Sequence, residues 1–333
     1  MSRHIAIVTP VLDDWESFAA LVEEISRRFS GGDVAFHVLA VDDGSTAAFD
    51  PDSLVLPPES CIAAVEVLRL ALNLGHQRAI AVGLCAIADR NDIDAVLVMD
   101  SDGEDRPMDI AALFAAGAHQ PGRVILAQRA KRSETRAFRF WYALYKLMFH
   151  ALTGRVINFG NYSLLPMAAV RRLVHMPELW NNLAAAIMRS RLPYATVPTS
   201  RGTRYAGRSS MDLVTLVVHG LSAMSVYTDM IFVRVLILAA LVAGLSIMGI
   251  LGITAIRFAT DLAIPGWATT VVGDLLIILL QTVVIVIATS LMMLAGRSHR
   301  PIIPIIDAQP YIASRQRCRL GRAGRTPVAR AAS

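Results

Sequence analysis

Two carboxylates that stand one residue apart, Asp100 and Asp102, directly follow the apolar run 95–99. At the end of a strand, such side chains can point into one loop and share a hard divalent cation. That ion prefers oxygen ligands and completes its shell with water and substrate phosphates. An acidic turn without a ligand has the same composition, so the position after an apolar run carries the argument. The spacing predicts a magnesium or manganese site at Asp100 and Asp102.

A second acidic turn, Asp42, Asp43 and Gly44, follows the apolar run 36–41. Carboxylates at this place can accept hydrogen bonds from a ribose or from a base edge, and Gly44 allows the backbone to turn tightly. The alternative is a plain Asp-Gly turn with no ligand, and the motif taken alone favours that alternative.

Two further polar segments suit phosphate. Residues 73–77, with Asn73 and His76, stand at the mouth of an expected helix. There His76 either contacts a diphosphate or caps and packs against the helix. Residues 201–210 form a basic loop, in which arginine and backbone donors suit phosphate oxygens. The alternative for this loop is a surface turn with solvated charges.

Short apolar runs alternate with helical patterns over the first half of the chain. Strands are expected at 5–8, 36–41, 65–70 and 95–99, and a helix follows the first of them. This alternation favours an α/β domain with a mostly parallel sheet and helices on both faces. Because ligands of such sheets bind at the carboxyl ends of the strands, we expect one crevice built by several loops.

Two uncharged runs, 235–256 and 275–296, predict membrane-spanning helices. At roughly 1.5 Å per residue each makes a helix of about 33 Å, against a hydrocarbon core of about 30 Å. A pair of buried core helices is the alternative, which two such runs in tandem make weak. The 333 residues are 54% apolar, which fits one α/β domain plus a membrane segment.

Charge sets the expected topology. Six of the arginines that give the chain its net charge of +5 lie between Arg315 and Arg330. By the positive-inside rule both termini face the cytoplasm. No secretory signal is visible at the N-terminus, so residues 1–230 are expected to be cytoplasmic. The basic end suits anionic lipids better than nucleic acid, and three scattered cysteines fit a reducing compartment.

A basic and aromatic stretch, 129–152, precedes the apolar runs. Its arginines are followed by aromatic side chains at helical spacing, which fits a core-facing helix and an interfacial helix equally well. A similar segment, 211–230, leads into the first apolar run. We therefore divide the chain into an α/β domain (1–210), a juxtamembrane segment (211–230), a two-helix hairpin (231–297) and a basic cytoplasmic tail (298–333) that is disordered after Arg315.

The order of these motifs resembles the family-two glycosyltransferases, and more narrowly the polyprenyl-phosphate glycosyltransferases of the dolichyl-phosphate mannose synthase-like group. The resemblance covers nearly the whole chain. Residues 9–14 look like the opening Pro-x-x-Asn-Glu loop of that family, and residues 42–45 look like its nucleotide-binding turn. Residues 100–107 resemble its Asp-x-Asp metal motif, and 204–210 resemble its basic Gly-x-Ser loop.

The resemblance implies a GT-A fold, a divalent metal cofactor and inverting transfer of a sugar from a UDP- or GDP-linked donor. The implied acceptor is a polyprenyl phosphate, such as undecaprenyl phosphate, on the cytoplasmic leaflet of the inner membrane. The product would be a lipid-linked monosaccharide for envelope glycans, and a homotetramer is a compatible assembly. The residues implied for the nucleotide-sugar are Pro10, Val11, Asp14, Asp43, Asn73, His76, Asp100 and Ser101. Those implied for the acceptor phosphate are Arg129, Arg132, Arg136, Arg204 and Ser209, and those for catalysis are Asp102, Asn161 and Arg204.

Two departures from the family pattern bear on the sugar. Asn158 and Asn161 stand where many members have aspartates, and an amide cannot act as a base. Gly103 and Glu104 stand where Leu-Gln is frequent. A processive polysaccharide synthase, a glycolipid-forming transferase and a non-enzymatic membrane scaffold remain alternatives. The first usually carries more spans and a Gln-x-x-Arg-Trp motif, and a scaffold would leave the acidic loops unexplained.

Overall fold

The computed structural model describes residues 3–57, 59–129, 147–155, 159–206, 220–260, 266–298, 300–318 and 321–322. The chain forms two compact units. The α/β unit comprises residues 1–139, 157–226 and 302–333, and the hairpin unit comprises residues 140–156 and 227–301. The predicted arginines Arg132 and Arg136, together with Asn158 and Ser209, lie outside the described residues.

An eight-stranded sheet forms the centre of the α/β unit, in the order β8-β6-β7-β5-β1-β2-β4-β9. Strand β1 runs parallel to both β2 and β5, β2 to β4, and β6 to β8, whereas β7 and β9 are antiparallel to their neighbours. The mostly parallel α/β sheet predicted from the sequence is therefore confirmed. The strands are β1 (Arg3–Val11), β2 (Val34–Asp42), β4 (Ile62–Leu70), β5 (Ala95–Val98), β6 (Val124–Arg129), β7 (Ser163–Pro166), β8 (Tyr194–Thr199) and β9 (Ile312–Cys318).

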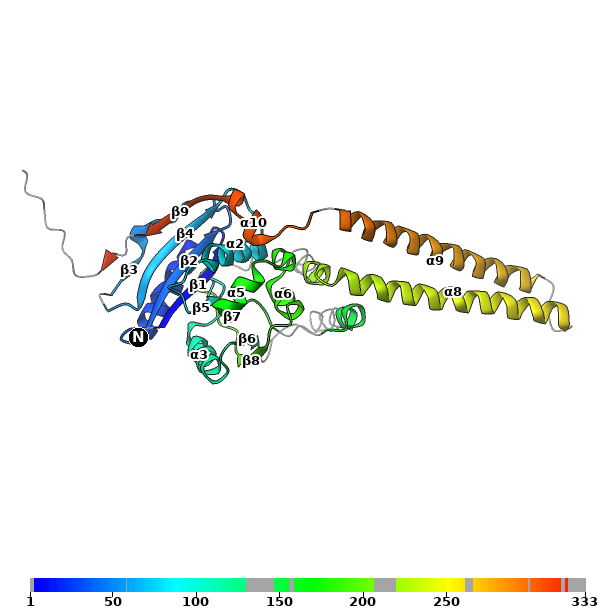
Figure 1. Ribbon diagram of the computed structural model, residues 1–333, viewed down its shortest axis with the longest axis horizontal. Coiled ribbons are helices and arrows are strands. Elements are labelled where there is room, and N and C mark those ends of the chain that lie inside the picture. The colour runs from blue at the N-terminus through cyan, green and yellow to red at the C-terminus, as the bar shows by residue number, and fades with distance from the viewer. Residues whose placement is uncertain are drawn as a thin grey trace, which may run out of the picture. The chain divides into compact units, whose positions relative to one another are not determined.

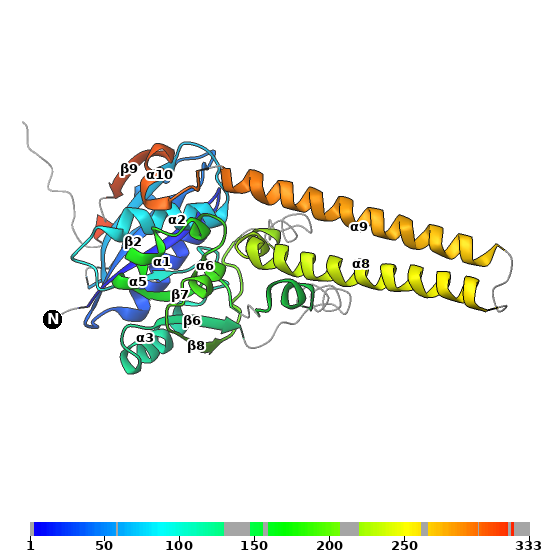
Figure 2. The same cartoon turned by 45° about the vertical axis from the view of Figure 1, so that its right-hand side comes forward.

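Helices cover both faces of this sheet (Figures 1 and 2). Side chains alternate between the faces along a strand, so that Ala6 and Val8 of β1 join one buried cluster while Ile5 and Ile7 join the other. The first cluster includes α2 (His76–Ala88), α5 (Met167–Leu173) and α6 (Leu183–Arg189), and the second includes α1 (Trp15–Phe29) and α3 (Ile110–His119). Smaller elements are η1 (Pro51–Ser53), β3 (Val55–Leu56), η2 (Pro107–Asp109), η3 (Pro177–Trp180), α10 (Pro304–Asp307), η4 (Gln309–Tyr311) and β10 (Gly321–Arg322).

The segment after the second apolar run returns to the sheet. Strand β9 pairs antiparallel with β4, and the ring of Tyr311 lies 5.5 Å from that of Trp180. Arg315 donates to Glu66 of β4 at 2.7 Å. The prediction that the chain is disordered after Arg315 is therefore wrong for residues 316–318 of β9 and for the short strand β10. The physical reason is that β4 would otherwise be an open edge, whose unpaired backbone groups favour a further strand.

The hairpin unit contains α8 (Thr228–Ala259) and α9 (Trp267–Ser298), which lie side by side (Figure 1). Both are long and apolar enough to cross a membrane, and they contain the two runs predicted to do so. Near the start of α8, Arg234 donates to the carbonyl oxygens of His150 and Ala151, and Tyr227 meets the ring of Phe149 edge to face. Residues 147–153, the described end of the aromatic stretch, are helical.

Candidate active site

The loops that follow β1, β2 and β5 meet at one edge of the sheet, because these three strands are parallel neighbours. The backbone N–H of Asp43 donates to the carbonyl oxygen of Val11 at 2.9 Å. On the other side, the hydroxyl of Ser101 donates to the carbonyl oxygen of Pro10 at 3.3 Å. The motifs that the sequence placed after separate strands therefore form one cluster, as expected for the carboxyl ends of a parallel sheet.

Asp43 holds the loop that leads into α2. Its buried carboxylate accepts hydrogen bonds from the backbone N–H groups of Leu74, at 2.7 Å, and Gly75, at 3.0 Å. Burial raises the pKa of Asp43 above its ordinary value, and these two hydrogen bonds act against that rise. The side chain thus fixes the turn that carries Asn73 and His76, while each oxygen keeps a lone pair for a ligand.

The loop after β1, which contains Asp13 and Asp14, contacts Thr46 on one side and Arg204 on the other. Asp13 adopts a positive φ of 50°, and its carboxylate accepts from the backbone N–H of Thr46 at 2.8 Å and from its hydroxyl at 2.7 Å. The hydroxyl hydrogen bond is the main reason that the pKa of Asp13 is lowered. The next residue, Asp14, lies 3.5 Å from the guanidinium of Arg204.

The predicted metal motif forms a tight acidic turn. The backbone N–H of Asp100 donates to Asp105 at 3.0 Å, and that of Glu104 donates to Asp102 at 2.9 Å. Gly103, which stands between Asp102 and Glu104, has a φ of +88°, a conformation that favours glycine. Burial raises the pKa of Asp102, and the charge of Asp100 acts in the same direction. A bound cation would offset both effects.

The oxygen donors of Asp100 and Asp102 fit a hard divalent cation such as Mg²⁺ or Mn²⁺. Among the described residues, no group of three or more His, Cys, Asp or Glu side chains is arranged to hold a metal ion. Two protein carboxylates completed by water and substrate phosphates are the usual arrangement for magnesium. The turn therefore suits an ion that arrives together with a diphosphate.

The loop 201–205, which we call the strap, lies against this acidic turn. The backbone N–H of Gly202 donates to the carbonyl oxygen of Glu104 at 2.8 Å, and that of Tyr205 donates to the carbonyl oxygen of Asp102 at 2.9 Å. Arg204 places one guanidinium nitrogen 3.1 Å from the Asp102 carboxylate. In this structure Arg204 therefore contacts the acids of the predicted metal and nucleotide sites.

His76 and Asn161 meet beside Asp100. The imidazole Nε2 of His76 lies 3.3 Å from Asp100 and 3.0 Å from the amide nitrogen of Asn161. Partial burial lowers the pKa of His76, but the nearby acids, Asp100 first, outweigh it and the net shift is upward. Nε2 cannot donate to Asp100 and accept from Asn161 at once, so the two contacts belong to different tautomers or protonation states of the ring.

Gln77 is a residue of this cluster to which we assigned no role from the sequence. Its carbonyl oxygen accepts from the backbone N–H of Leu183 at 2.9 Å, and its amide nitrogen donates to Asn161 at 3.0 Å. These bonds orient the Asn161 amide with its nitrogen toward His76. The signal for this role in the sequence is weak, because Gln77 merely follows His76 and its two partners lie far along the chain.

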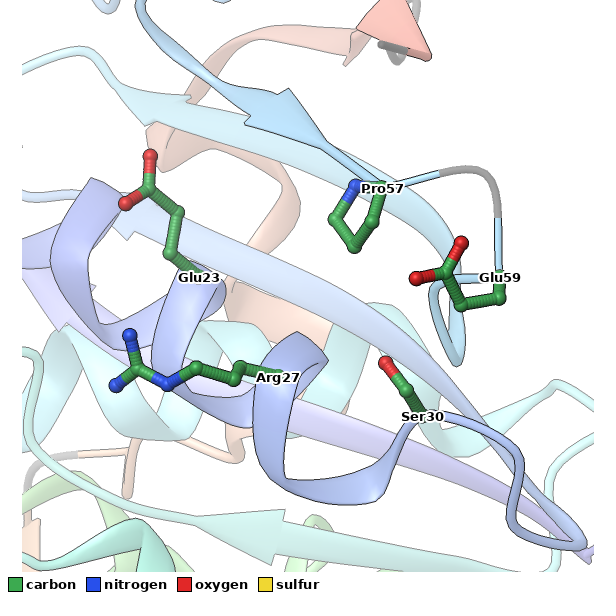
Figure 3. Close-up of a pocket in the computed structure, with 5 residues that line it drawn as sticks. All are labelled: Glu23, Arg27, Ser30, Pro57 and Glu59. Atoms are coloured by element: carbon green, nitrogen blue, oxygen red, sulfur yellow. The ribbon is translucent and has the colours of Figure 1, made fainter. Parts of the chain in front are cut away.

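Of the other predicted acceptor residues, only the backbone of Arg129 belongs to the described part of the chain. The backbone of Arg129 ends β6, where it pairs with Thr199 of β8, and Arg132, Arg136 and Ser209 lie outside the described residues. A separate open pocket of ≈ 400 Å³ contains none of the predicted site residues (Figure 3). It is lined by Glu23 and Arg27 of α1, by Ser30 just after that helix, and by Pro57 and Glu59 of the segment before β4.

Comparison with known proteins gives relatives by sequence. The undecaprenyl-phosphate 4-deoxy-4-formamido-L-arabinose transferase of Yersinia pestis (strain Pestoides F) is 25% identical over 181 residues, which cover 52% of this chain and 50% of the relative. The uncharacterized glycosyltransferase YkoT of Bacillus subtilis (strain 168) is 27% identical over 248 residues, 71% of this chain and 68% of the relative. The chain spans about half the length of the transferase relatives it matches. No protein-family model matches it.

Solved structures with a partly similar course of the backbone include two synthases. Glucosyl-3-phosphoglycerate synthase from Mycobacterium tuberculosis, in complex with Mn²⁺, UDP and glucosyl-3-phosphoglycerate, has a TM-score of 0.47 and 15% identity, covering 68% of this chain and 80% of that one. Mannosyl-3-phosphoglycerate synthase from Rubrobacter xylanophilus has a TM-score of 0.44 and 13% identity, covering 67% and 72%.

The chain is related to the glycosyltransferases, as its motifs predicted, and combines an α/β unit of that class with two apolar helices. Relatives of this class include undecaprenyl-phosphate 4-deoxy-4-formamido-L-arabinose transferases. The predicted resemblance to polyprenyl-phosphate glycosyltransferases is thereby confirmed.

Proposed function

We propose that this protein transfers a sugar from a nucleotide-sugar to a polyprenyl phosphate, such as undecaprenyl phosphate, at the cytoplasmic face of the inner membrane. The observation that carries the proposal is the acidic turn of Asp100 and Asp102. It stands beside the β1 loop, which also contacts the β2 loop, at the carboxyl ends of parallel strands, in a chain that also has two apolar helices. Undecaprenyl phosphate in the names of relatives supports the acceptor class.

The nucleotide-sugar donor is assigned to the site formed by the loops that follow β1, β2 and β5, at the carboxyl ends of these strands. Asp14 and Asp43, with Pro10, Val11 and Asn73, lie on the side proposed for the nucleoside of a UDP- or GDP-linked sugar. Asp100, Ser101 and His76 lie on the side proposed for the diphosphate. A divalent metal held by Asp100 and Asp102 would supply positive charge against the charge that develops on the leaving nucleoside diphosphate.

The transfer itself needs little acid–base chemistry from the protein. A lipid phosphate is already ionised near neutral pH, so one of its oxygens can attack the anomeric carbon without a strong general base. As that bond forms, the bond from the anomeric carbon to the diphosphate breaks, and the nucleoside diphosphate leaves with the electron pair. A single displacement of this kind inverts the configuration at the anomeric carbon.

Asn161 and the arginines are assigned supporting roles. The Asn161 amide, oriented by Gln77, offers hydrogen-bond donors next to Asp100 and is the residue proposed to meet the sugar. Arg129, Arg132, Arg136, Arg204 and Ser209 are proposed to surround the phosphates of donor and acceptor, for which guanidinium groups are suited. Both termini are proposed to face the cytoplasm, with α8 and α9 crossing the membrane.

The test is a release assay on the purified full chain in detergent. The protein is incubated with undecaprenyl phosphate, Mn²⁺ or Mg²⁺ and single donors: UDP- and GDP-linked hexoses, and UDP-linked 4-deoxy-4-formamido-L-arabinose. Release of the nucleoside diphosphate is expected with at least one donor, and it should require both the lipid phosphate and the metal. Release that is independent of the lipid would point to hydrolysis or another acceptor and would contradict the proposal.

A further inference from the structure

The strap is attached to the acidic turn by its backbone. Besides the hydrogen bonds from Gly202 to Glu104 and from Tyr205 to Asp102, the two segments approach closely at glycines. A β-carbon on Gly202 would overlap the carbonyl oxygen of Gly103, and a β-carbon on Gly103 would come within 2.7 Å of the Tyr205 ring. The strap can therefore lie this close only because both positions lack a side chain.

Side chains at both ends of the strap add to this attachment. Arg201 forms an ion pair with Glu104, and the hydroxyl of Tyr205 contacts Glu24 of α1. Gly103 and Glu104 are the two positions at which the metal motif departs from the family pattern, and here both serve the contact with the strap. Because these contacts do not involve the side chain of Arg204, the strap can stay docked when that side chain moves.

Arg204 bridges two carboxylates. One guanidinium nitrogen lies 3.1 Å from Asp102 and the other 3.5 Å from Asp14. The Arg204 side chain is 26% exposed, compared with 44% for Arg201, so its ion pairs are less weakened by solvent. Its Nε is buried and has no hydrogen-bond partner among the described residues. An arginine that binds anions through its fork would use this nitrogen as well.

These contacts place a cation where the proposed metal would bind. A guanidinium at 3.1 Å from the Asp102 carboxylate and a metal ion on the same carboxylate compete for its negative charge. When the metal takes Asp102, the guanidinium loses its main partner. It then lies beside a metal-bound diphosphate, whose oxygens can accept from Nε and a terminal nitrogen together.

We propose that Arg204 is the counter-cation of Asp102 in the donor-free protein, that a divalent cation displaces its guanidinium from this carboxylate, and that the docked strap then holds Arg204 on the donor diphosphate. This inference rests on the proposed function, because it takes Asp102 as a metal ligand. It assigns Gly103 and Gly202 as positioning residues for Arg204, because their backbone contact keeps the strap docked without the Arg201–Glu104 pair.

The proposal predicts effects of opposite sign for one substitution. In Arg204→Met the metal meets no competing guanidinium, so Mn²⁺ alone should bind more tightly than to the wild type, by about fivefold or more. The nucleoside diphosphate loses its arginine, so UDP or GDP in saturating Mg²⁺ should bind about tenfold more weakly. A residue that only maintained the fold would lower both affinities, and a residue that only contributed remote charge would change both weakly.

The experiment measures both affinities on the full chain in detergent. Mn²⁺ binding is followed by electron paramagnetic resonance, and UDP and GDP binding by calorimetry. Arg201→Met is the matched control, because it removes the same charge from the same loop without contacting Asp102. It should change Mn²⁺ affinity by less than about threefold, an effect that added salt weakens. Arg204→Lys, which keeps the charge without the fork, should bind Mn²⁺ with an affinity between those of the wild type and Arg204→Met.

The outcomes separate this inference from the proposed function. Tighter Mn²⁺ binding with weaker nucleotide binding in Arg204→Met supports the inference. Equal Mn²⁺ affinities in Arg204→Met and Arg201→Met, or a change of the same sign in both titrations, would overturn it and leave the metal site intact. If neither Mn²⁺ nor either nucleotide binds the wild type, the proposed function itself fails and the inference with it.

Discussion

The carbonyl oxygen of Gly103 occupies the place that a β-carbon on Gly202 would need. The two glycines belong to loops that are far apart in the sequence, and their contact brings the strap onto the Asp102 turn. A glycine in a loop is commonly explained by backbone conformation alone. Here Gly103 has both a φ of +88° and a crowded approach by the Tyr205 ring and the carbonyl oxygen of Thr203.

Substitution of Gly103 by alanine separates these two reasons. Gly122→Ala is the matched control, since Gly122 has a φ of +79° and no atom within 4 Å of the place that a β-carbon would take. Both variants should lose about 1 kcal/mol of stability from the backbone. Only Gly103→Ala should also displace the strap, and its transfer rate should fall about tenfold or more. Thermal unfolding and initial rates check this, and equal rates in the two variants would argue against a role for the strap.

Asp43 offers a second test, because its carboxylate accepts from two backbone N–H groups. In Asp43→Asn the amide NH₂ replaces one accepting oxygen and faces an N–H of Leu74 or Gly75. A buried donor left without an acceptor costs about 1–3 kcal/mol. We expect a lower melting temperature and weaker binding of UDP or GDP, because the turn before α2 shifts. Asp33→Asn, on an exposed residue, is the control, and unchanged nucleotide binding in Asp43→Asn would contradict the placement of this turn in the donor site.

His37 predicts a dependence of stability on pH. Burial and the charge of Arg90 lower its pKa below the ordinary value of 6.5; His4 and Arg317 act in the same direction, and Asp92 acts against it. The unfolded chain therefore takes up this proton at a higher pH than the folded one. His37 lowers stability as the pH falls below about 6.5 and contributes little above about pH 7.5. The melting temperature of His37→Gln minus that of the wild type should therefore be larger at about pH 5.5 than at about pH 7.5.

The control for His37 is His175→Gln, since His175 is exposed and lies just after the end of α5. Its melting temperature relative to the wild type should change little between the two pH values. If His37→Gln also shows the same difference from the wild type at both pH values, burial and Arg90 do not govern its protonation.

Local patterns predicted much of the α/β unit. The runs before Asp42 and Asp100 form β2 and β5, and their acidic ends lie at the same end of the sheet, on either side of the β1 loop, because both strands run parallel to β1. Strand β9 was missed because the sequence Ile312–Cys318 is mostly polar and basic. It is exposed along most of its length, so its place depends on the open edge of β4 and not on an apolar pattern of its own.

The composition of the site was easier to predict than its contacts. Asp100, Asp102, Asp43 and His76 stand directly after strands or at the mouth of a helix, so their types and positions indicated binding. The partner of Arg204 was not predictable in the same way, because an arginine pairs equally well with a phosphate or with a carboxylate. Only the fold brings Asp14 and Asp102 to it, and only the fold joins Gln77 to Leu183 and Asn161.

Mass spectrometry of the lipid product shows whether the protein transfers a sugar to undecaprenyl phosphate. The purified protein, undecaprenyl phosphate, Mn²⁺ and each donor of the panel are incubated, and the extracted lipid is analysed. We expect undecaprenyl phosphate carrying one added sugar with at least one donor, and about a hundredfold less of it from Asp102→Ala. Absence of any lipid-linked sugar from a wild-type protein that binds nucleotide, or equal product from Asp102→Ala, would contradict the proposed function.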